Sequence, residues 1–97
     1  MVKTKGRSAE TLEQAFCRTL VARRKKKGLS QMDLAVASGY SLRYIGDIER
    51  GAKSATMRTM HDLATLLDVR LGILVVEAEN LLEIDSIPAM LHKAFQR

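Results

Sequence analysis

Residues 28–51 read GLSQMDLAVASGYSLRYIGDIERG, a stretch that contains the start and stop signals of two short helices. Ser30 stands three residues before Asp33, which is the spacing of a capping box, so the first helix is predicted to begin at Gln31. Gly39 ends this helix, because glycine adopts the positive φ of a sharp turn without steric cost. The stretch therefore predicts a helix, a tight turn and a second helix.

The second helix is predicted to run from its N-cap Ser41 to Arg50, with Gly51 just past its end. At about 100° per residue, its inward side carries Ile45, Ile48, Leu42 and Glu49. Its outward side carries Arg43, Asp47 and Arg50, and its flanks carry Gly46 and Tyr44. A short helix with a polar outer face, placed after another short helix and a tight turn, is the layout of a helix-turn-helix. In that motif the second helix enters the DNA major groove.

The rest of the chain is predicted to be helical as well. Apolar residues recur at helical spacing over residues 10–26 and 56–67, and one face of the latter segment carries Met57, Met60, Leu63, Ala64 and Leu67. Residues 73–76 (ILVV) are compatible with a strand, but the apolar positions of residues 70–82 follow helical spacing and no paired hairpin signal lies nearby. The sequence thus predicts an all-α bundle of about five helices with a C-terminal helical extension.

Charge is divided unevenly along the chain, which carries a net charge of +5 over 97 residues. Residues 1–58 hold thirteen Lys/Arg and five Asp/Glu, whereas residues 59–97 hold three Lys/Arg and six Asp/Glu. This asymmetry favours a polyanion-binding N-terminal part joined to a C-terminal part with a different use.

Other features of the composition indicate a cytoplasmic protein. A single cysteine excludes an internal disulfide framework and fits a reducing compartment. The N-terminus lacks the pattern of a signal peptide, and the longest unbroken apolar run is residues 73–76, far too short to span a bilayer. We therefore expect a cytoplasmic location and no association with a membrane.

The same stretch resembles the lambda-repressor/Cro-type helix-turn-helix, also called the xenobiotic-response-element family. The matching features are the G-L-S-Q opening, Ala35 four residues before Gly39, Ile45 six residues after that glycine, the I-E-R-G ending and the downstream segment TMHDLATLLDV. The resemblance covers about residues 12–76. One departure is Ala55, at a position where many family members carry proline.

The resemblance implies a transcriptional regulator, a repressor, that binds double-stranded DNA sequence-specifically with the helix at 41–50 in the major groove. It implies base contacts from Leu42, Arg43, Gly46 and Asp47. It implies contacts to the DNA backbone from Gln31, Ser41, Tyr44, Arg50 and Lys53. An arginine such as Arg43 can bind O6 and N7 of guanine in bidentate fashion, whereas phosphate contacts from Arg50 and Lys53 position a protein without reading sequence.

Several of these residues have a second interpretation that does not involve DNA. Arg43 and Asp47 have the i,i+4 spacing of an ion pair within one helix. Tyr44 can pack in the core, and Leu42 can pack beneath Tyr44. Gly46 costs about 1 kcal/mol relative to alanine inside a helix, and it either allows close approach to bases or is a tolerated defect. The sequence leaves these alternatives open.

Glu49 is expected to form a buried ion pair. It lies near the inward side of its helix, where an unpaired carboxylate is costly. The family resemblance pairs this position with an arginine of the first helix, which here is Arg24. We therefore expect Arg24 and Glu49 to connect the first and third helices.

The C-terminal part offers material for a homodimer. It holds more apolar residues than one face of a short terminal segment needs, and we assign to the dimer contact Ile73, Val76, Leu81, Leu82, Ile84, Ile87, Leu91 and Phe95. A two-fold dimer doubles the base contacts on a palindromic site. The alternative is that the last helix folds back on its own chain. The predicted organisation is a flexible basic arm at 1–9, a helix-turn-helix domain at 10–76 and a dimerisation extension at 77–97.

Enzymatic function is not expected. Cys17 has no histidine near it in the sequence, His61 and His92 are isolated without the spacing of zinc ligands, and no phosphate-binding glycine loop is present. We expect no catalytic residue, no metal and no cofactor. Two alternatives remain beside a DNA-binding regulator. One is the antitoxin of a toxin–antitoxin pair, which adds a regulatory protein partner, and the other is a protein-interaction module with a helix-turn-helix fold.

Overall fold

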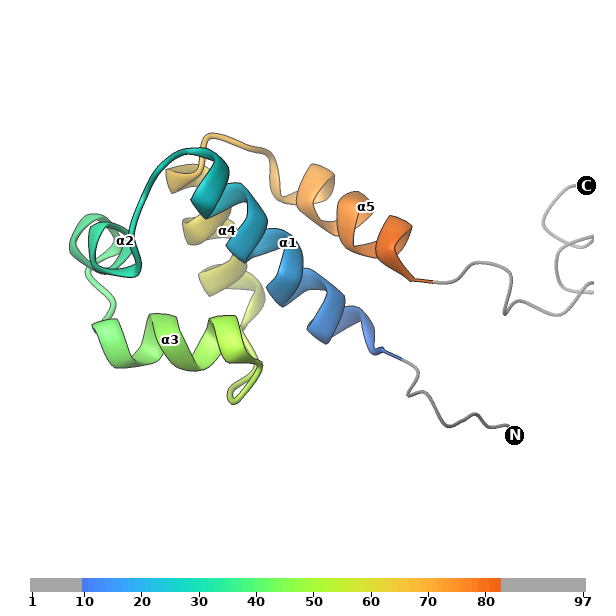
Figure 1. The fold of residues 1–97 in the computed structure, drawn as a ribbon, viewed down its shortest axis with the longest axis horizontal. Helices are drawn as coiled ribbons and strands as arrows, with labels where there is room; N and C mark the ends of the chain where they lie inside the picture. Colours follow the sequence, from blue (N-terminus) through green and yellow to red (C-terminus); the bar gives the residue numbers. More distant parts are fainter. Residues whose placement is uncertain (1–9, 83–97) are drawn as a thin grey trace, which may run out of the picture.

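Five α-helices joined by short connections form the part of the chain that the structure, a computed structural model, describes, residues 10–82 (Figure 1). The helices are α1 (Leu12–Lys26), α2 (Gln31–Ser38), α3 (Leu42–Arg50), α4 (Met57–Leu66) and α5 (Leu71–Leu81). This order confirms the predicted all-α class. Residues 73–76, which were also compatible with a strand, lie within helix α5, as the helical spacing predicted.

The ends of the helices follow the capping signals in the sequence. Backbone N–H of Asp33 donates to Ser30 Oγ (2.9 Å) and backbone N–H of Ser30 donates to Asp33 Oδ2 (2.8 Å), so the predicted capping box of α2 is confirmed. Gly39 ends α2 with φ of 82°, as a tight turn requires. α1 begins at Leu12, two residues later than expected, because Thr11 and Gln14 form a second capping box there.

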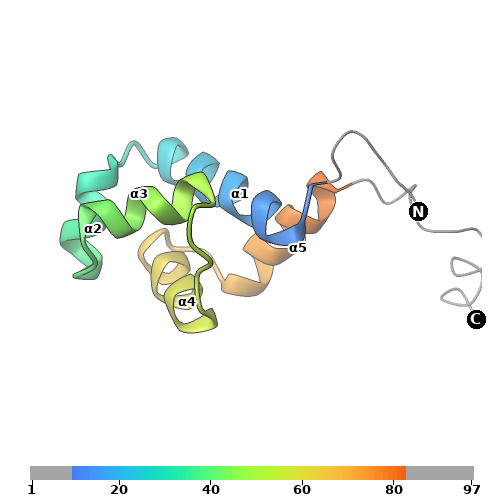
Figure 2. The same cartoon turned by 90° about the horizontal axis from the view of Figure 1, so that it is seen from below.

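α1 packs antiparallel to α5, and α4 lies on the other side of the bundle from α1 (Figure 2). The core lies between the helices. Its largest fully buried side chains come from all five helices and the C-cap of α4: Leu20, Leu34, Ile45, Ile48, Leu63, Leu67 and Leu74. Met57 was expected on the inward face of α4 but is exposed, because it occupies the first turn of the helix.

α5 is tied to α1 along its length, so it belongs to the same unit as the other helices. Ala78 is fully buried in the core, and the Glu77 carboxylate accepts hydrogen bonds from Nε (3.1 Å) and Nη2 of Arg23. The hydrogen bonds from Arg23 hold the pKa of Glu77 below its usual value. The expected domain boundary after residue 76 falls inside this helix.

Some predictions concern residues that the structure does not describe. The basic arm at 1–9 and the assigned dimer residues Ile84, Ile87, Leu91 and Phe95 lie outside the described range. None of the helices over residues 10–82 is long and apolar enough to cross a membrane.

Candidate nucleic-acid interface

The predicted helix-turn-helix is formed by α2, the turn at Gly39 and α3. α2 and α3 contact each other, and α3 lies along one edge of the bundle with α2 beside its N-terminal end (Figures 1 and 2). Ser41 Oγ accepts a hydrogen bond from backbone N–H of Tyr44 (3.0 Å), which fixes the start of α3. Gly51 ends it with φ of 75°.

The helical wheel of α3 is confirmed for Ile45 and Ile48, both buried in the core, and for the exposed Arg43. Two placements are wrong. Leu42, the first residue of α3, is 42% exposed instead of inward. Asp47 was expected on the outward face, yet only 7% of its surface is exposed.

Asp47 is covered by cations from its own helix and the following loop. Its Oδ1 accepts a hydrogen bond from Nη2 of Arg50, and its Oδ2 lies 4.0 Å from Nζ of Lys53. The intrahelical partner is therefore Arg50, and not Arg43 as the i,i+4 spacing suggested. Among residues 10–82, Arg43 takes part in none of the ion pairs.

Gly46 is buried, and its missing side chain has a local use. A Cβ at this position would lie 3.1 Å from Nη1 of Arg50 and 3.8 Å from Oε1 of Gln31. The first of these distances is tighter than ordinary van der Waals contact. The glycine thus leaves room for the guanidinium of Arg50 beside α3.

The expected ion pair between Arg24 and Glu49 is present and buried. Nε and Nη2 of Arg24 donate to the two carboxylate oxygens of Glu49 at 2.5 and 2.9 Å, and the two side chains are 9% and 4% exposed. Nη1 of Arg24 donates to the carbonyl oxygen of Leu29 (2.8 Å), and Nε2 of Gln31 donates to Glu49 Oε1 (2.8 Å). The pair therefore fixes the side chain of Gln31 as well as joining α1 to α3.

The sequence did not indicate a hydrogen-bonded cluster that joins the turn and α3 to α4. The hydroxyl of Tyr40 donates to Asp62 Oδ2 (2.6 Å), and the hydroxyl of Tyr44 lies 3.2 Å from Thr59 Oγ1. The two tyrosine rings are 5.3 Å apart in a tilted arrangement. The hydroxyl of Tyr44 thus faces α4, in line with its packing interpretation, and its contact to a DNA phosphate stays a prediction.

Removing the Tyr40 hydroxyl by Tyr40→Phe is expected to destabilise the fold, because the Asp62 carboxylate loses its donor. Tyr44→Phe is the matched control, since it also removes a tyrosine hydroxyl, but one whose partner is the uncharged hydroxyl of Thr59. It is therefore expected to lower the midpoint of urea unfolding by less than Tyr40→Phe does. The bond to Asp62 raises the pKa of Tyr40 above its usual value. This contribution to stability is present below the pKa of an unfolded tyrosine and is lost as pH rises through the folded value. Equal midpoints for the two variants would contradict the role of Tyr40.

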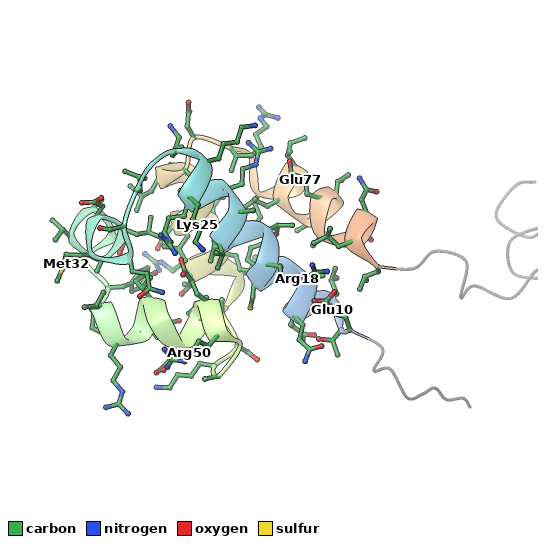
Figure 3. The ribbon with its side chains drawn as sticks, in the orientation of Figure 1. Glu10, Arg18, Lys25, Met32, Arg50 and Glu77 are labelled. Atoms are coloured by element: carbon green, nitrogen blue, oxygen red, sulfur yellow. The ribbon has the colours of Figure 1, made fainter. Side chains whose placement is uncertain are left out.

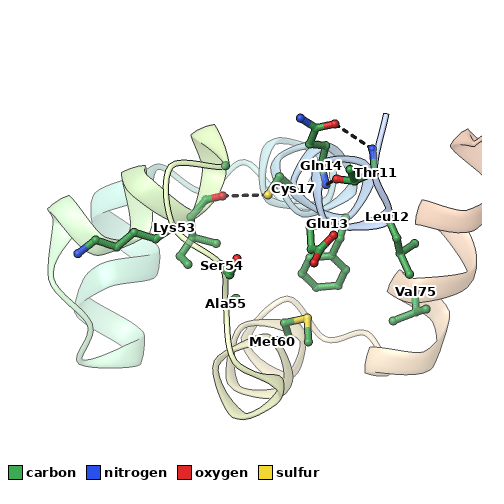
Figure 4. Close-up of a pocket in the computed structure, with 13 residues that line it drawn as sticks. Thr11, Leu12, Glu13, Gln14, Cys17, Lys53, Ser54, Ala55, Met60 and Val75 are labelled. Carbon is green, nitrogen blue, oxygen red and sulfur yellow. Dashed lines mark hydrogen bonds between the residues drawn. The ribbon is translucent and has the colours of Figure 1, made fainter. Parts of the chain in front are cut away.

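Cys17 has the properties of a structural thiol. Its Sγ donates to the carbonyl oxygen of Ile48 (3.0 Å) beside a cavity of about 490 Å³ that α1, the α3–α4 connection, Met60 and Val75 line (Figure 4). Burial raises the pKa of the thiol, which favours the protonated and weakly nucleophilic form. Within residues 10–82, no three His, Cys, Asp or Glu side chains are grouped so that they could hold a metal.

The exposed groups of this region gather around α3 and the start of α2. Figure 3 shows Arg50 on α3 and Met32 on α2, and the Arg18–Glu10 ion pair borders the same hollow as Arg50. Lys53 follows α3 in the loop and is exposed, and Gln31 is half-buried at the N-terminus of α2. A helix N-terminus presents free backbone N–H groups and the positive end of the helix dipole, both of which attract anions.

Comparison with known proteins gives related sequences and folds. The sequence profile of the family described as Helix-turn-helix matches residues 20–74. A curated relative from Sinorhizobium fredii, the uncharacterized HTH-type transcriptional regulator y4dJ, is 39% identical over 46 residues. The match spans 47% of this chain and 60% of the relative, so it covers less than two-thirds of the relative's length.

Two solved structures are similar over most of their own lengths. The clp gene regulator ClgR from Corynebacterium glutamicum has a TM-score of 0.72 at 25% identity, over 77% of this chain and 97% of that one. The restriction-modification controller protein C.AhdI from Aeromonas hydrophila has a TM-score of 0.60 at 38% identity, over 65% of this chain and 94% of that one.

Proposed function

The chain belongs to the Helix-turn-helix family, with a lambda-repressor-like fold, and from this premise we propose that it binds double-stranded DNA sequence-specifically as a transcriptional regulator. In this proposal α3 enters the major groove, and Arg43 reads a base. Gln31, Arg50 and Lys53 contact phosphates. The relatives are regulators and not enzymes, in line with the expected absence of catalysis.

The observation that carries the proposal is the exposure of Arg43 on a helix whose other arginine, Arg50, is held by Asp47. Arg43 and Arg50 are seven residues apart, about two helical turns, so they project from the same side of α3. Arg50 and Gln31 both border the space at Gly46, so the end of α3 and the start of α2 contribute to one surface. A free guanidinium flanked by phosphate-binding groups is the arrangement that direct readout requires.

Selection of bound duplexes from a random DNA pool tests this function. The expected result is enrichment of one sequence, with at least one guanine required at a fixed position. A pool that stays random after repeated rounds, although the protein binds it, would reduce the function to sequence-independent binding.

We further propose that the regulator acts as a homodimer on a palindromic site, with α5 in the contact. Ile73 and Val76 on α5 are 46% and 50% exposed, and Leu81 is also exposed near the end of the helix. Leu82 is half-buried and packs against the core of its own chain. In a two-fold dimer, two copies of α3 reach half-sites about 34 Å apart.

The substitution Val76→Asp is expected to convert the dimer to a monomer, because each copy then places a charge in the apolar contact without a partner. Sedimentation equilibrium at micromolar concentration measures the change. Val36→Asp is the matched control, since Val36 is a highly exposed valine in the helix α2, outside the proposed contact. It is expected to leave the dimer intact. A wild-type monomer, or an intact Val76→Asp dimer, would exclude α5 as the interface.

The repressor role is part of the same proposal, because a dimer that occupies the major groove excludes other proteins from its site. A reporter gene placed after the selected sequence tests it. Its output is expected to fall when the protein is produced, and a rise in output would instead indicate an activator.

A further inference from the structure

Asp47 is the one buried carboxylate that α3 directs toward its DNA-facing side, among the residues that the structure describes. Its side chain is only 10% exposed, whereas the side chains of Arg50 and Lys53, which cover it, are 65% and 62% exposed. An acidic group at the centre of a surface proposed to bind phosphates opposes that binding, so its presence requires a reason.

The backbone around Asp47 is also fixed. Its carbonyl oxygen accepts hydrogen bonds from the backbone N–H groups of Ala52 (2.8 Å) and Lys53 (3.4 Å), which hold the loop after α3 against the end of the helix. On the other side, the guanidinium of Arg50 occupies the space that Gly46 leaves open. The side chain of Asp47 therefore holds the guanidinium of Arg50 and lies beside the ammonium group of Lys53.

We propose that Asp47 is a positioning residue that restrains sequence-independent DNA binding by holding Arg50 against Gly46 and by partly neutralising Arg50 and Lys53. This inference rests on the proposed function and deepens it, because it assigns to Asp47 a role in specificity. Asp47 acts through the two cations and contacts no base.

The restraint follows from the way in which cations attract DNA. An unrestrained arginine reaches phosphates in many orientations of the protein on the duplex, and each such contact adds affinity for any sequence. An arginine fixed along α3 meets a phosphate in few orientations, among them the one in which α3 lies correctly in the groove. Fixing it in advance also lowers the ordering cost in that one complex. The clamp thus weakens binding to random DNA more than binding to the preferred site.

The variant Asp47→Asn, which replaces the carboxylate by an uncharged amide of the same shape, tests this role. Its affinity for a random-sequence duplex at low salt is expected to rise roughly three- to tenfold. The slope of log K against log salt is expected to steepen by about one unit, the value for one additional phosphate contact. On the sequence selected from the random pool, the gain is expected to be smaller, so the ratio of specific to random affinity falls.

Two controls separate the clamp from a general change of charge. Asp68→Asn removes the same charge from an exposed aspartate on the α4–α5 connection, at the opposite edge of the molecule from α3 in Figure 1. It is expected to leave both the affinity and the slope near the wild-type values. In the double variant Asp47→Asn with Arg50→Gln, the gain on random DNA is expected to disappear, because the freed cation is absent.

The outcomes also distinguish this proposal from the alternative that Asp47 accepts a hydrogen bond from a cytosine amine. If Asp47→Asn loses affinity only on the selected sequence and is unchanged on random DNA, Asp47 is a base-reading residue and the clamp is refuted. If Asp47→Asn and Asp68→Asn bind random DNA alike, the clamp is refuted as well. The random-duplex measurement needs no selected site, so it still decides the role of Asp47 if the pool shows no sequence preference.

Discussion

Glu49→Ala is expected to destabilise the protein by about 3–5 kcal/mol, because it leaves the buried guanidinium of Arg24 without its carboxylate. For a domain of this size each kcal/mol lowers Tm by about 4–8 °C, so the expected fall is at least about 12 °C. The side chain of Gln31 loses its acceptor in the same variant. Thermal unfolding followed by circular dichroism measures the effect.

A double variant shows how much of this loss is the stranded charge. Arg24→Met combined with Glu49→Ala is expected to be more stable than Glu49→Ala alone, since the double variant leaves no unpaired charge at the site of the pair. The recovery is expected to be partial, because the carbonyl oxygen of Leu29 and the amide of Gln31 still lack partners.

Glu79→Ala is the matched control for Glu49→Ala. Glu79 is exposed on α5 and belongs to none of the ion pairs found over residues 10–82. Its replacement is expected to change stability by no more than about 0.5 kcal/mol. Small and additive effects of Glu49→Ala and Arg24→Met would show that the pair contributes little to stability.

The helix boundaries were predictable from the sequence because their causes are local. Ser30 and Asp33 cap α2 through bonds that span three residues, and Gly39 and Gly51 end α2 and α3 through their own positive φ. The capping box of Thr11 and Gln14 is equally local, and the S/T-x-x-E/Q pattern would have identified it. The pairing of Arg24 with Glu49 came from the family resemblance, since a wheel shows only that Glu49 points inward.

The contacts that the sequence did not reveal depend on the packing of distant segments or on a choice between partners. Tyr40 meets Asp62 only because α2 packs on α4, and nothing within a few residues of either marks the bond. Asp47 had two arginines within reach on α3, and the wheel cannot decide between them. In the structure Asp47 binds Arg50, whose guanidinium lies over the missing side chain of Gly46.

The buried ion pair and the proposed DNA surface are physically continuous. Glu49 binds Arg24 on one side and Gln31 on the other, and both Oε1 of Gln31 and the guanidinium of Arg50 border the space at Gly46. Hydrogen bonds that are protected from water hold their side chains in one orientation. The buried pair thus positions Gln31, which we propose contacts a phosphate, whereas Arg43 is left exposed for the base contact that we propose for it.

Arg43→Ala is expected to lower affinity for the selected sequence by about 1–3 kcal/mol, the value of one bidentate contact between arginine and guanine. On random DNA the loss is expected to be small, because a base-reading arginine contributes to affinity mainly where its base is present. The preference at one base pair of the selected site is expected to relax. Fluorescence anisotropy with the selected duplex, its single-base variants and a random duplex measures all three.

Variants of Gln31 and Lys53, which we propose contact phosphates, and of the distant Arg70 provide the comparison for Arg43→Ala. Gln31→Ala and Lys53→Ala are expected to lower the affinity for all DNA sequences alike. The loss of the lysine is expected to reduce the slope of log K against log salt by about one unit. Arg70→Ala removes the same charge from an exposed residue at the start of α5, whose side chain makes no capping bond, and is expected to change little. If Arg43→Ala weakens the selected and random duplexes by the same factor, Arg43 binds phosphate, and sequence reading must then lie with other residues of α3.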